Sequence, residues 1–240
     1  MAEPAAVKTN RELFERSMRF DCRAILFDLD GVLMDSTRAV ERQWRLWAEE
    51  NCLDPAKIIE VAHGRRTVET ISLVMPHIDA AAEAAKLEKR EANDVEGVTV
   101  MPGASGLLAS LPRGRWCVVT SGTRYLATRR LALGNLPIPD TLITADDVRE
   151  GKPHPEPYLK GAERLGVEPP ECLVIEDAPA GIRAARAAGM KAIALTSTYE
   201  ALELAEADAI VSTLGELEIR TNGDGIEISL AERALPQQIF

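Results

Sequence analysis

From about residue 101 onward, short apolar runs alternate along the chain with stretches of helical periodicity. The apolar runs predict strands at 116–119, 142–143, 173–175, 192–195 and 209–211. The stretches between them predict helices at 105–111, 124–133, 155–165 and 179–188. Strands that are apolar at consecutive positions are buried on both faces, which is typical of parallel sheets between two layers of helices. The alternation therefore predicts an α/β fold with a mostly parallel sheet.

Residues 37–98 interrupt this pattern because they carry only helical signals. Helices are expected at 37–50, 55–63, 68–74 and 79–93. Val40, Trp44 and Trp47 recur at helical spacing and are expected to pack in a core, and Asp35 or Ser36 is expected to cap the first helix. This block lies between the first strand and the alternating remainder, so we predict an inserted helical domain, called the cap below. The predicted boundaries are 1–36 and 99–240 for the core and 37–98 for the cap.

The two ends of the chain carry weaker signals. Residues 1 to about 20 are polar and predict a loosely docked lead-in. Near the C-terminus, the segments 218–221 and 225–230 flank Asn222, Gly223 and Asp224, a pattern that predicts a terminal β-hairpin.

Two aspartates follow the first predicted strand, which ends at Phe27. Side chains at i and i+2 of an extended chain leave on the same face, so Asp28 and Asp30 are expected to point into one space. Gly31 permits the turn that follows. At ~4 Å and an effective dielectric constant of ~20, two like charges repel by about 4 kcal/mol. A divalent cation that prefers oxygen ligands, most plausibly Mg2+, would convert this repulsion into binding; the alternative is a strand that ends in an ordinary polar turn.

Polar residues also follow two of the later strands. Thr120, Ser121 and Gly122 come directly after the strand at 116–119, just before a helix. Hydroxyl and N–H groups at a helix N-terminus can bind an anion, although Ser and Thr are also common helix caps. Lys152 lies on a stiff Gly-Lys-Pro segment that can direct its ammonium toward the carboxylates. His154, beside prolines, is expected to have a structural role in the loop.

A second acidic pair, Glu176 and Asp177, follows the strand at 173–175 and opens a helix. Acidic residues favour helix N-termini for electrostatic reasons alone. However, ligands of open parallel sheets bind at the carboxyl ends of the strands. The joint occurrence of two acidic pairs, a hydroxyl-glycine turn and a lysine at such ends therefore predicts one active site.

Composition excludes some classes of function. The formal net charge of the 240-residue chain is -10, which argues against nucleic-acid and anionic-membrane binding. The four cysteines are widely spaced and form no Cys-x-x-Cys motif, and no signal peptide or long apolar span is visible. These features predict a cytoplasmic protein whose cysteines are reduced thiols.

The motifs resemble those of the haloacid dehalogenase superfamily, and the resemblance covers nearly the whole chain. Asp28-x-Asp30-Gly31 is similar to its first motif, Thr120 to its second, Lys152 to its third and Glu176-Asp177 to its fourth. The block at 37–98 resembles the small cap of one large subgroup, so the resemblance implies a Rossmann-like core with an inserted helical cap. Segments 63–67, 120–124, 151–158 and 176–181 are similar to sugar phosphatases, glycerol phosphatases and 2-deoxyglucose-6-phosphate phosphatases. Val32 and Ala178 depart from residues common in that subgroup, which bears on the substrate more than on the reaction.

The resemblance implies a Mg2+-dependent phosphatase that acts on small phosphorylated sugars or polyols. Asp28 would attack phosphorus and form an aspartyl-phosphate, and Asp30 would protonate the leaving oxygen and then activate water. Mg2+ would be held by Asp28, Asp177 and the backbone carbonyl of Asp30, with Glu176 acting through water. The residues expected to hold the phosphoryl group are Thr120, Ser121, Gly122 and Lys152. An acid beside the nucleophile argues against dehalogenation, because a halide leaving group needs no proton.

The cap is expected to select the substrate. His63, Arg65 and Arg66 lie at a helix junction that is expected to close over the active site. Arg66 is the strongest candidate for contacting sugar hydroxyls or gating closure, and a salt bridge on the cap surface is the alternative.

Two other functions compete with this interpretation. A phosphosugar mutase of the β-phosphoglucomutase type shares the fold, the cap type and the motifs. A non-catalytic phosphosugar sensor is disfavoured because all the reacting groups are present in the sequence.

Overall fold

The computed structural model describes residues 18–62, 64–223 and 225–230. Its centre is a six-stranded parallel sheet with the strand order β6-β5-β2-β7-β8-β9. The strands are β2 (Ala24–Phe27), β5 (Trp116–Val119), β6 (Leu142–Ile143), β7 (Cys172–Glu176), β8 (Lys191–Leu195) and β9 (Ala209–Val211). The predicted strands all form, and the predicted α/β fold class is confirmed. Because β2 pairs with β5 on one side and with β7 on the other, the two aspartates that follow it lie at the middle of the sheet edge.

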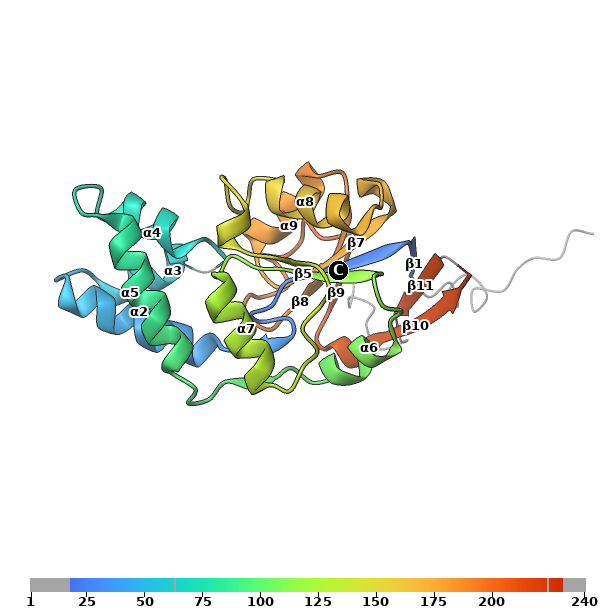
Figure 1. Ribbon diagram of the computed structural model, residues 1–240, viewed down its shortest axis with the longest axis horizontal. Coiled ribbons are helices and arrows are strands. Elements are labelled where there is room, and N and C mark those ends of the chain that lie inside the picture. The colour runs from blue at the N-terminus through green and yellow to red at the C-terminus, as the bar shows by residue number, and fades with distance from the viewer. Residues whose placement is uncertain (1–17, 63, 224, 231–240) are drawn as a thin grey trace, which may run out of the picture.

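Helices cover both faces of the sheet (Figure 1). One face packs against α6 (Ala104–Ser110) and α7 (Arg124–Leu133), and the other against α8 (Glu156–Leu165) and α9 (Pro179–Ala187). Ile25 and Phe27 of β2 belong to the hydrophobic cluster of α6 and α7, whereas Ala24 and Leu26 belong to that of α8 and α9. Neighbouring side chains of a strand point to opposite faces, so a strand covered on both sides has to be apolar at every position.

Two smaller sheets flank this core. A three-stranded antiparallel sheet consists of β1 (Arg19–Cys22), β11 (Gly225–Leu230) and β10 (Leu217–Asn222). The predicted terminal hairpin therefore forms, although its turn residue Asp224 is outside the described residues. The expected lead-in is wrong from Arg19 onward, because that segment is a strand whose Phe20 and Cys22 are buried. A second small sheet pairs β3 (Met34–Asp35) with β4 (Thr99–Val100), where the chain leaves the core and returns to it.

Four helices lie between β3 and β4: α2 (Thr37–Glu50), α3 (Pro55–Ala62), α4 (Thr67–Val74) and α5 (Ala80–Asn93). They enclose a hydrophobic cluster of their own that includes Trp44, Trp47, Ile71 and Leu87. The two tryptophan rings meet edge to face with centroids 5.5 Å apart, so both are packing residues. Figure 1 places these helices as a group beside the carboxyl ends of the sheet strands. The division at 37 and 98 stays a prediction.

Three single 3-10 turns complete the secondary structure of the described residues: η1 (Ala145–Asp147), η2 (Pro169–Glu171) and η3 (Leu214–Glu216). None of the helices within the described ranges is long and apolar enough to cross a membrane.

Candidate active site

Four of the predicted site residues form one buried cluster at the carboxyl ends of the strands. Lys152 Nζ lies 2.5 Å from Asp28 Oδ1 and 2.7 Å from Glu176 Oε1, and it donates to the carbonyl oxygen of Val119 at 3.1 Å. Asp177 follows Glu176 directly, and its carboxylate lies beside that of Asp28. All four ionisable side chains are buried. Residues that are far apart in sequence therefore meet because Asp28, Glu176 and Asp177 lie at the ends of the neighbouring strands β2 and β7, and the loop between β6 and α8 brings Lys152 to them.

The cluster holds three carboxyl groups against one ammonium. Burial raises the pKa of Asp28 to about 7 although Lys152 opposes the shift. Burial and the carboxylates of Glu176 and Asp28 raise the pKa of Asp177 well above its ordinary value. Burial also acts to raise the pKa of Glu176, but Lys152 outweighs it and the net shift is downward. Burial disfavours the ammonium of Lys152, yet Asp28 and Glu176 outweigh that effect and raise its pKa, so Lys152 is a cation.

The uncompensated negative charge fits a divalent cation. Asp28, Glu176 and Asp177 each place a carboxylate oxygen within 4.8 Å of the others. Buried carboxylates without a counter-charge are costly, and Mg2+ prefers oxygen ligands of this kind. Gly31, at φ +79°, leaves room for the Asp177 carboxylate, because a Cβ there would lie 1.9 Å from Asp177 Oδ2. The donor set and the charge therefore suit Mg2+.

Glu176 has the most completely engaged carboxylate of the three. Oε1 accepts hydrogen bonds from Lys152 Nζ and from the Tyr158 hydroxyl at 2.9 Å. Oε2 accepts from the backbone N–H groups of Asp177 and Ala178 at 2.8 and 2.9 Å. A Cβ on Gly181 would lie 1.6 Å from Oε1, so this glycine is needed for the carboxylate to fit. These contacts suit a residue that positions Lys152 better than a metal ligand that acts through water. Sequence reasoning missed Tyr158, a fully buried residue of α8.

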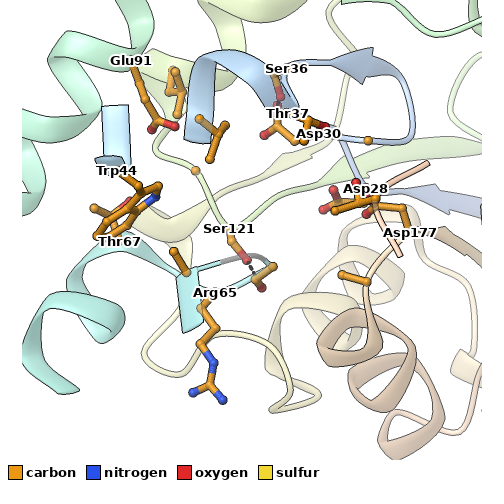
Figure 2. Close-up of a pocket in the computed structure, with 18 of the residues that line it drawn as sticks. Asp28, Asp30, Ser36, Thr37, Trp44, Arg65, Thr67, Glu91, Ser121 and Asp177 are labelled. Atoms are coloured by element: carbon orange, nitrogen blue, oxygen red, sulfur yellow. Dashed lines mark hydrogen bonds between the residues drawn. The ribbon is translucent and has the colours of Figure 1, made fainter. Parts of the chain in front are cut away.

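Asp30 faces the same cavity as Asp28 but has different partners (Figure 2). The Ser36 hydroxyl donates to Asp30 Oδ1 at 2.6 Å, and Arg130 Nη1 forms an ion pair with Oδ2 at 2.5 Å. Ser36 is the N-cap residue of α2, one of the two expected, but its side chain makes no capping hydrogen bond there. The Asp35 carboxylate accepts instead, weakly, from the N–H of Thr37 at 3.4 Å.

The hydroxyl-glycine turn after β5 reaches the cavity next to Asp28. Thr120 is buried, and its Oγ1 accepts from the N–H of Gly122 at 3.1 Å. Ser121 and Gly122 line the cavity. The Ser121 hydroxyl donates to the carbonyl oxygen of Gly64 in the cap at 3.1 Å, so this turn also joins the core to the cap. Its role in binding phosphate stays a prediction.

Of the three residues of the cap that are predicted to select the substrate, the structure describes two. His63 lies outside the described residues. Arg65 lines the cavity rim through part of its length, but its guanidinium points away from Asp28 in Figure 2. Arg66 binds Glu69 of its own helix and donates to two carbonyl oxygens of the core loop, those of Val148 at 3.1 Å and Arg149 at 2.6 Å. The ion-pair alternative for Arg66 is the one that the structure displays, rather than contact with the cavity.

The cavity between the core and the cap contains residues that sequence reasoning missed. Trp44, Thr67 and Glu91 line it from the cap, opposite Asp28 and Asp177 (Figure 2). Burial raises the pKa of Glu91 to about 7 although Arg130 opposes the shift. Glu91 and Arg130 lie on the buried faces of α5 and α7, but a charged residue in a helix predicts an exposed position, so the sequence carries no signal for either.

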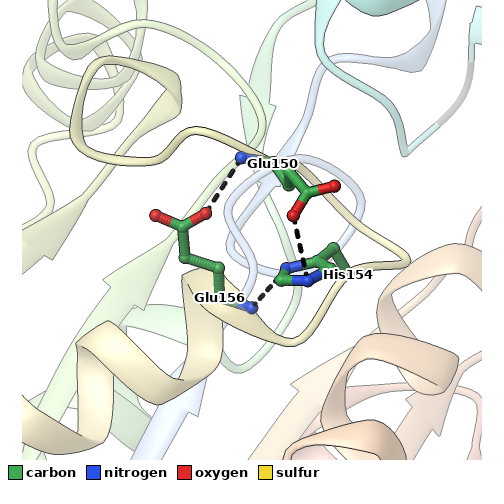
Figure 3. A group of neighbouring side chains, drawn as sticks. All are labelled: Glu150, His154 and Glu156. Carbon is green, nitrogen blue, oxygen red and sulfur yellow. Dashed lines mark hydrogen bonds and ion pairs between the residues drawn. The ribbon is translucent and has the colours of Figure 1, made fainter.

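A second group of possible metal ligands, Glu150, His154 and Glu156, lies on both sides of Lys152 in the sequence (Figure 3). His154 Nε2 lies 3.1 Å from the Glu150 carboxylate, and its Nδ1 accepts from the N–H of Glu156 at 3.2 Å. The Glu156 carboxylate accepts in turn from the N–H groups of Arg149 and Glu150. These contacts brace the loop that carries Lys152, in agreement with the structural role expected for His154.

The sequence matches the family described as haloacid dehalogenase-like hydrolase over residues 22–189. Hexitol phosphatase A of Escherichia coli is 40% identical over 212 residues, which are 85% of this chain and 98% of that protein. Glycerol-1-phosphate phosphohydrolase 2 of Saccharomyces cerevisiae is 35% identical over 232 residues, 92% of this chain and 93% of that protein. The crystal structure of a hydrolase from Pseudomonas syringae superimposes with a TM-score of 0.67 at 29% identity and covers 80% of this chain and 93% of that one. The chain therefore belongs to the haloacid dehalogenase-like hydrolases, as its motifs predict.

Proposed function

We propose that the protein is a Mg2+-dependent phosphatase that hydrolyses small phosphorylated sugars or polyols through an aspartyl-phosphate intermediate. The observation that carries this proposal is the 2.5 Å contact between Lys152 Nζ and Asp28 Oδ1 beside the cavity between core and cap. An ammonium at this place orients the carboxylate for attack and stabilises the charge of the phosphoryl oxygens.

In the proposed reaction an oxygen of Asp28 bonds to phosphorus while the bond from phosphorus to the substrate oxygen breaks. Asp30 protonates the leaving oxygen, and it then accepts a proton from the water that hydrolyses the aspartyl-phosphate. Lys152, the Thr120 hydroxyl and the backbone N–H groups of the residues that follow Asp28 and Thr120 hold the phosphoryl oxygens during both steps.

We assign the Mg2+ site to Asp28, Asp177 and the backbone carbonyl of Asp30. When bound, the ion would neutralise part of the charge on the phosphoryl group. Glu176 holds Lys152 in this scheme, because both of its oxygens already accept hydrogen bonds.

The substrate class rests on the cavity and on the relatives. Hexitol and glycerol phosphatases are similar to this chain over most of their lengths. The cap side of the cavity presents Thr67 and Trp44, groups that suit the hydroxyls and carbon chain of a small polyol. We also propose a cytoplasmic location, since the four cysteines are free thiols.

The test is a phosphate-release screen over hexitol, hexose, pentose and glycerol phosphates, with and without Mg2+ and with Asp28→Asn as the blank. Release that depends on Mg2+ and disappears in the blank supports the proposal. Interconversion of hexose 1- and 6-phosphates in place of steady release would identify a mutase. Binding of these esters without any turnover would identify a sensor.

A further inference from the structure

A second buried group of charges lies where the cap meets the core, and the proposed reaction leaves most of it unused. Arg130 of α7 is only 5% exposed although it carries a full charge. Its Nη1 lies 2.5 Å from Asp30 Oδ2, and its Nη2 lies 3.4 Å from Glu91 Oε1. Asp30 follows the central strand of the core, whereas Glu91 belongs to α5 of the cap. One guanidinium thus joins the proposed acid to a cap helix.

Asp30 is held at both of its carboxylate oxygens. The buried Ser36 hydroxyl fixes Oδ1 at 2.6 Å, and Arg130 fixes Oδ2. A carboxylate held in this way has one orientation toward the cavity. Proton transfer to a leaving oxygen requires heavy atoms within about 2.6–3.2 Å of each other, so a fixed orientation matters to an acid more than to a residue that only binds substrate.

Packing alone gives Arg130 no reason to be charged. Its neighbours on the buried face of α7 are Leu126, Ala127 and Leu131, and an apolar residue would suit that face. Replacing buried ion pairs by well-packed hydrophobic residues is often neutral or stabilising. A buried arginine between two carboxylates, one of which is the proposed acid, therefore calls for an explanation beyond stability.

We infer that Arg130 is a positioning residue that holds Asp30 in the orientation required for protonating the leaving oxygen, and that Glu91 anchors Arg130 to the cap. This inference rests on the proposed phosphatase function, in which Asp30 is the acid. If the inference holds, the orientation of Asp30 depends on the position of α5, so the cap contributes to the proton transfer as well as to substrate choice.

The test compares two phosphate esters that differ in their need for an acid. The leaving group of an alkyl ester such as glycerol or hexitol phosphate is an alkoxide unless its oxygen is protonated. The leaving group of p-nitrophenyl phosphate is a stable phenolate. For Arg130→Met we expect kcat on the alkyl ester to fall about tenfold to a hundredfold, part of the factor that general acids typically contribute. We expect a much smaller fall on the aryl ester, and Arg130→Lys should restore part of the alkyl activity.

Two further variants complete the experiment. Arg129→Met makes the same substitution at an exposed position of the same helix and should change neither rate. Glu91→Gln keeps the ion pair between Arg130 and Asp30 but removes the anchoring charge, so it should produce a smaller loss with the same preference for the aryl ester. This variant also serves as the test if Arg130→Met does not fold.

Equal losses on the two esters, or no loss on either, would overturn the inference while the phosphatase function stands. If the wild type releases phosphate from neither ester, the proposed function fails and the inference fails with it. A selective loss on the alkyl ester, partly restored by lysine, supports the inference, because a merely structural role would reduce both activities together.

Discussion

The two buried charge clusters of this protein are built from similar residue types but differ in where their members come from. The lysine cluster of Asp28, Lys152, Glu176 and Asp177 lies entirely on segments that follow strands of the core sheet. The arginine cluster of Asp30, Glu91 and Arg130 joins the core to the cap.

This difference separates two requirements of the proposed reaction. The proposed nucleophile and its charged partners Lys152, Glu176 and Asp177 all belong to the core. The acid is close to the nucleophile in sequence, yet its carboxylate is held by a residue that also binds a cap helix. In the proposed reaction the core therefore binds the phosphoryl group, and the leaving group lies at the junction of core and cap.

The largest effect is expected in the lysine cluster at the nucleophile. Asp28→Asn keeps the shape but removes the attacking charge, so phosphate release should fall by about three orders of magnitude or more on every ester, whatever its leaving group. Steady-state rates on an alkyl and an aryl phosphate check this. A variant that retained substantial activity on either ester would remove Asp28 from the role of nucleophile.

A smaller loss is expected when the partner of Lys152 is changed. Lys152 and Tyr158 both donate hydrogen bonds to the Glu176 carboxylate. Glu176→Gln replaces this carboxylate by a neutral amide, so the ammonium of Lys152 loses a negatively charged partner. We expect kcat to fall about tenfold to a hundredfold, the scale found for supporting residues of charged sites, and to fall equally on alkyl and aryl esters. Glu163→Gln on the exposed face of α8 is the matched control. A loss confined to alkyl esters would contradict the division between the two clusters.

The lysine cluster could be predicted from the sequence because its signals are local. Asp28 follows the apolar run of β2 and Glu176 ends that of β7, whereas Lys152 lies on the Gly-Lys-Pro segment of the loop between β6 and α8. Strand ends of a parallel sheet converge at one edge whatever the details of packing. The strands and helices were predicted for the same reason, since consecutive apolar residues and helical spacing report burial directly.

The arginine cluster could not be predicted from the sequence in this way. Arg130 and Glu91 are ordinary helix residues in sequence, and only the packing of α5 against α7 makes them partners. Strand β1 was missed because its partner is the C-terminal hairpin, with Arg19 opposite Ser229. For Arg66, the residue type suggested a substrate contact, but the direction of its side chain depends on the carbonyl oxygens of a core loop.

The Arg66 pair supplies the next prediction. Glu69, which binds Arg66, accepts a hydrogen bond from the N–H of Gly151 at 3.0 Å, directly before Lys152. Arg66→Ala should loosen the cap on this loop and lower kcat/KM by a few fold, the effect of about 1 kcal/mol, while the ranking of substrates stays the same. The same measurements on Arg65→Ala, at the neighbouring position, provide the comparison. A reversed ranking of sugar phosphates for Arg66→Ala would restore this residue to direct substrate contact.

The smallest expected effect concerns stability, and it follows from the sign of the pKa shifts. Burial raises the pKa of Asp28 and of Glu91 to about 7, and it raises that of Asp177 as well. A carboxyl group with a raised pKa binds more protons in the folded than in the unfolded protein, so the metal-free protein should lose stability as pH rises from about 4 toward 7.

Groups with a lowered pKa act in a different range. The pKa of Glu156 falls to about 2 because of Lys160 and two backbone N–H groups, so its contribution is lost only as the solution becomes strongly acidic. Between pH 5 and 8 the raised groups therefore dominate, and thermal unfolding without metal should show a Tm that falls as the pH rises. Because Mg2+ is assigned to the lysine cluster alone, it should recover the part of this loss that comes from Asp28 and Asp177 and leave the part that comes from Glu91. Glu91→Gln should remove the remainder. A Tm that Mg2+ leaves unchanged at pH 8 would contradict the assigned metal site, whereas full recovery by Mg2+ would mean that the two clusters titrate as one.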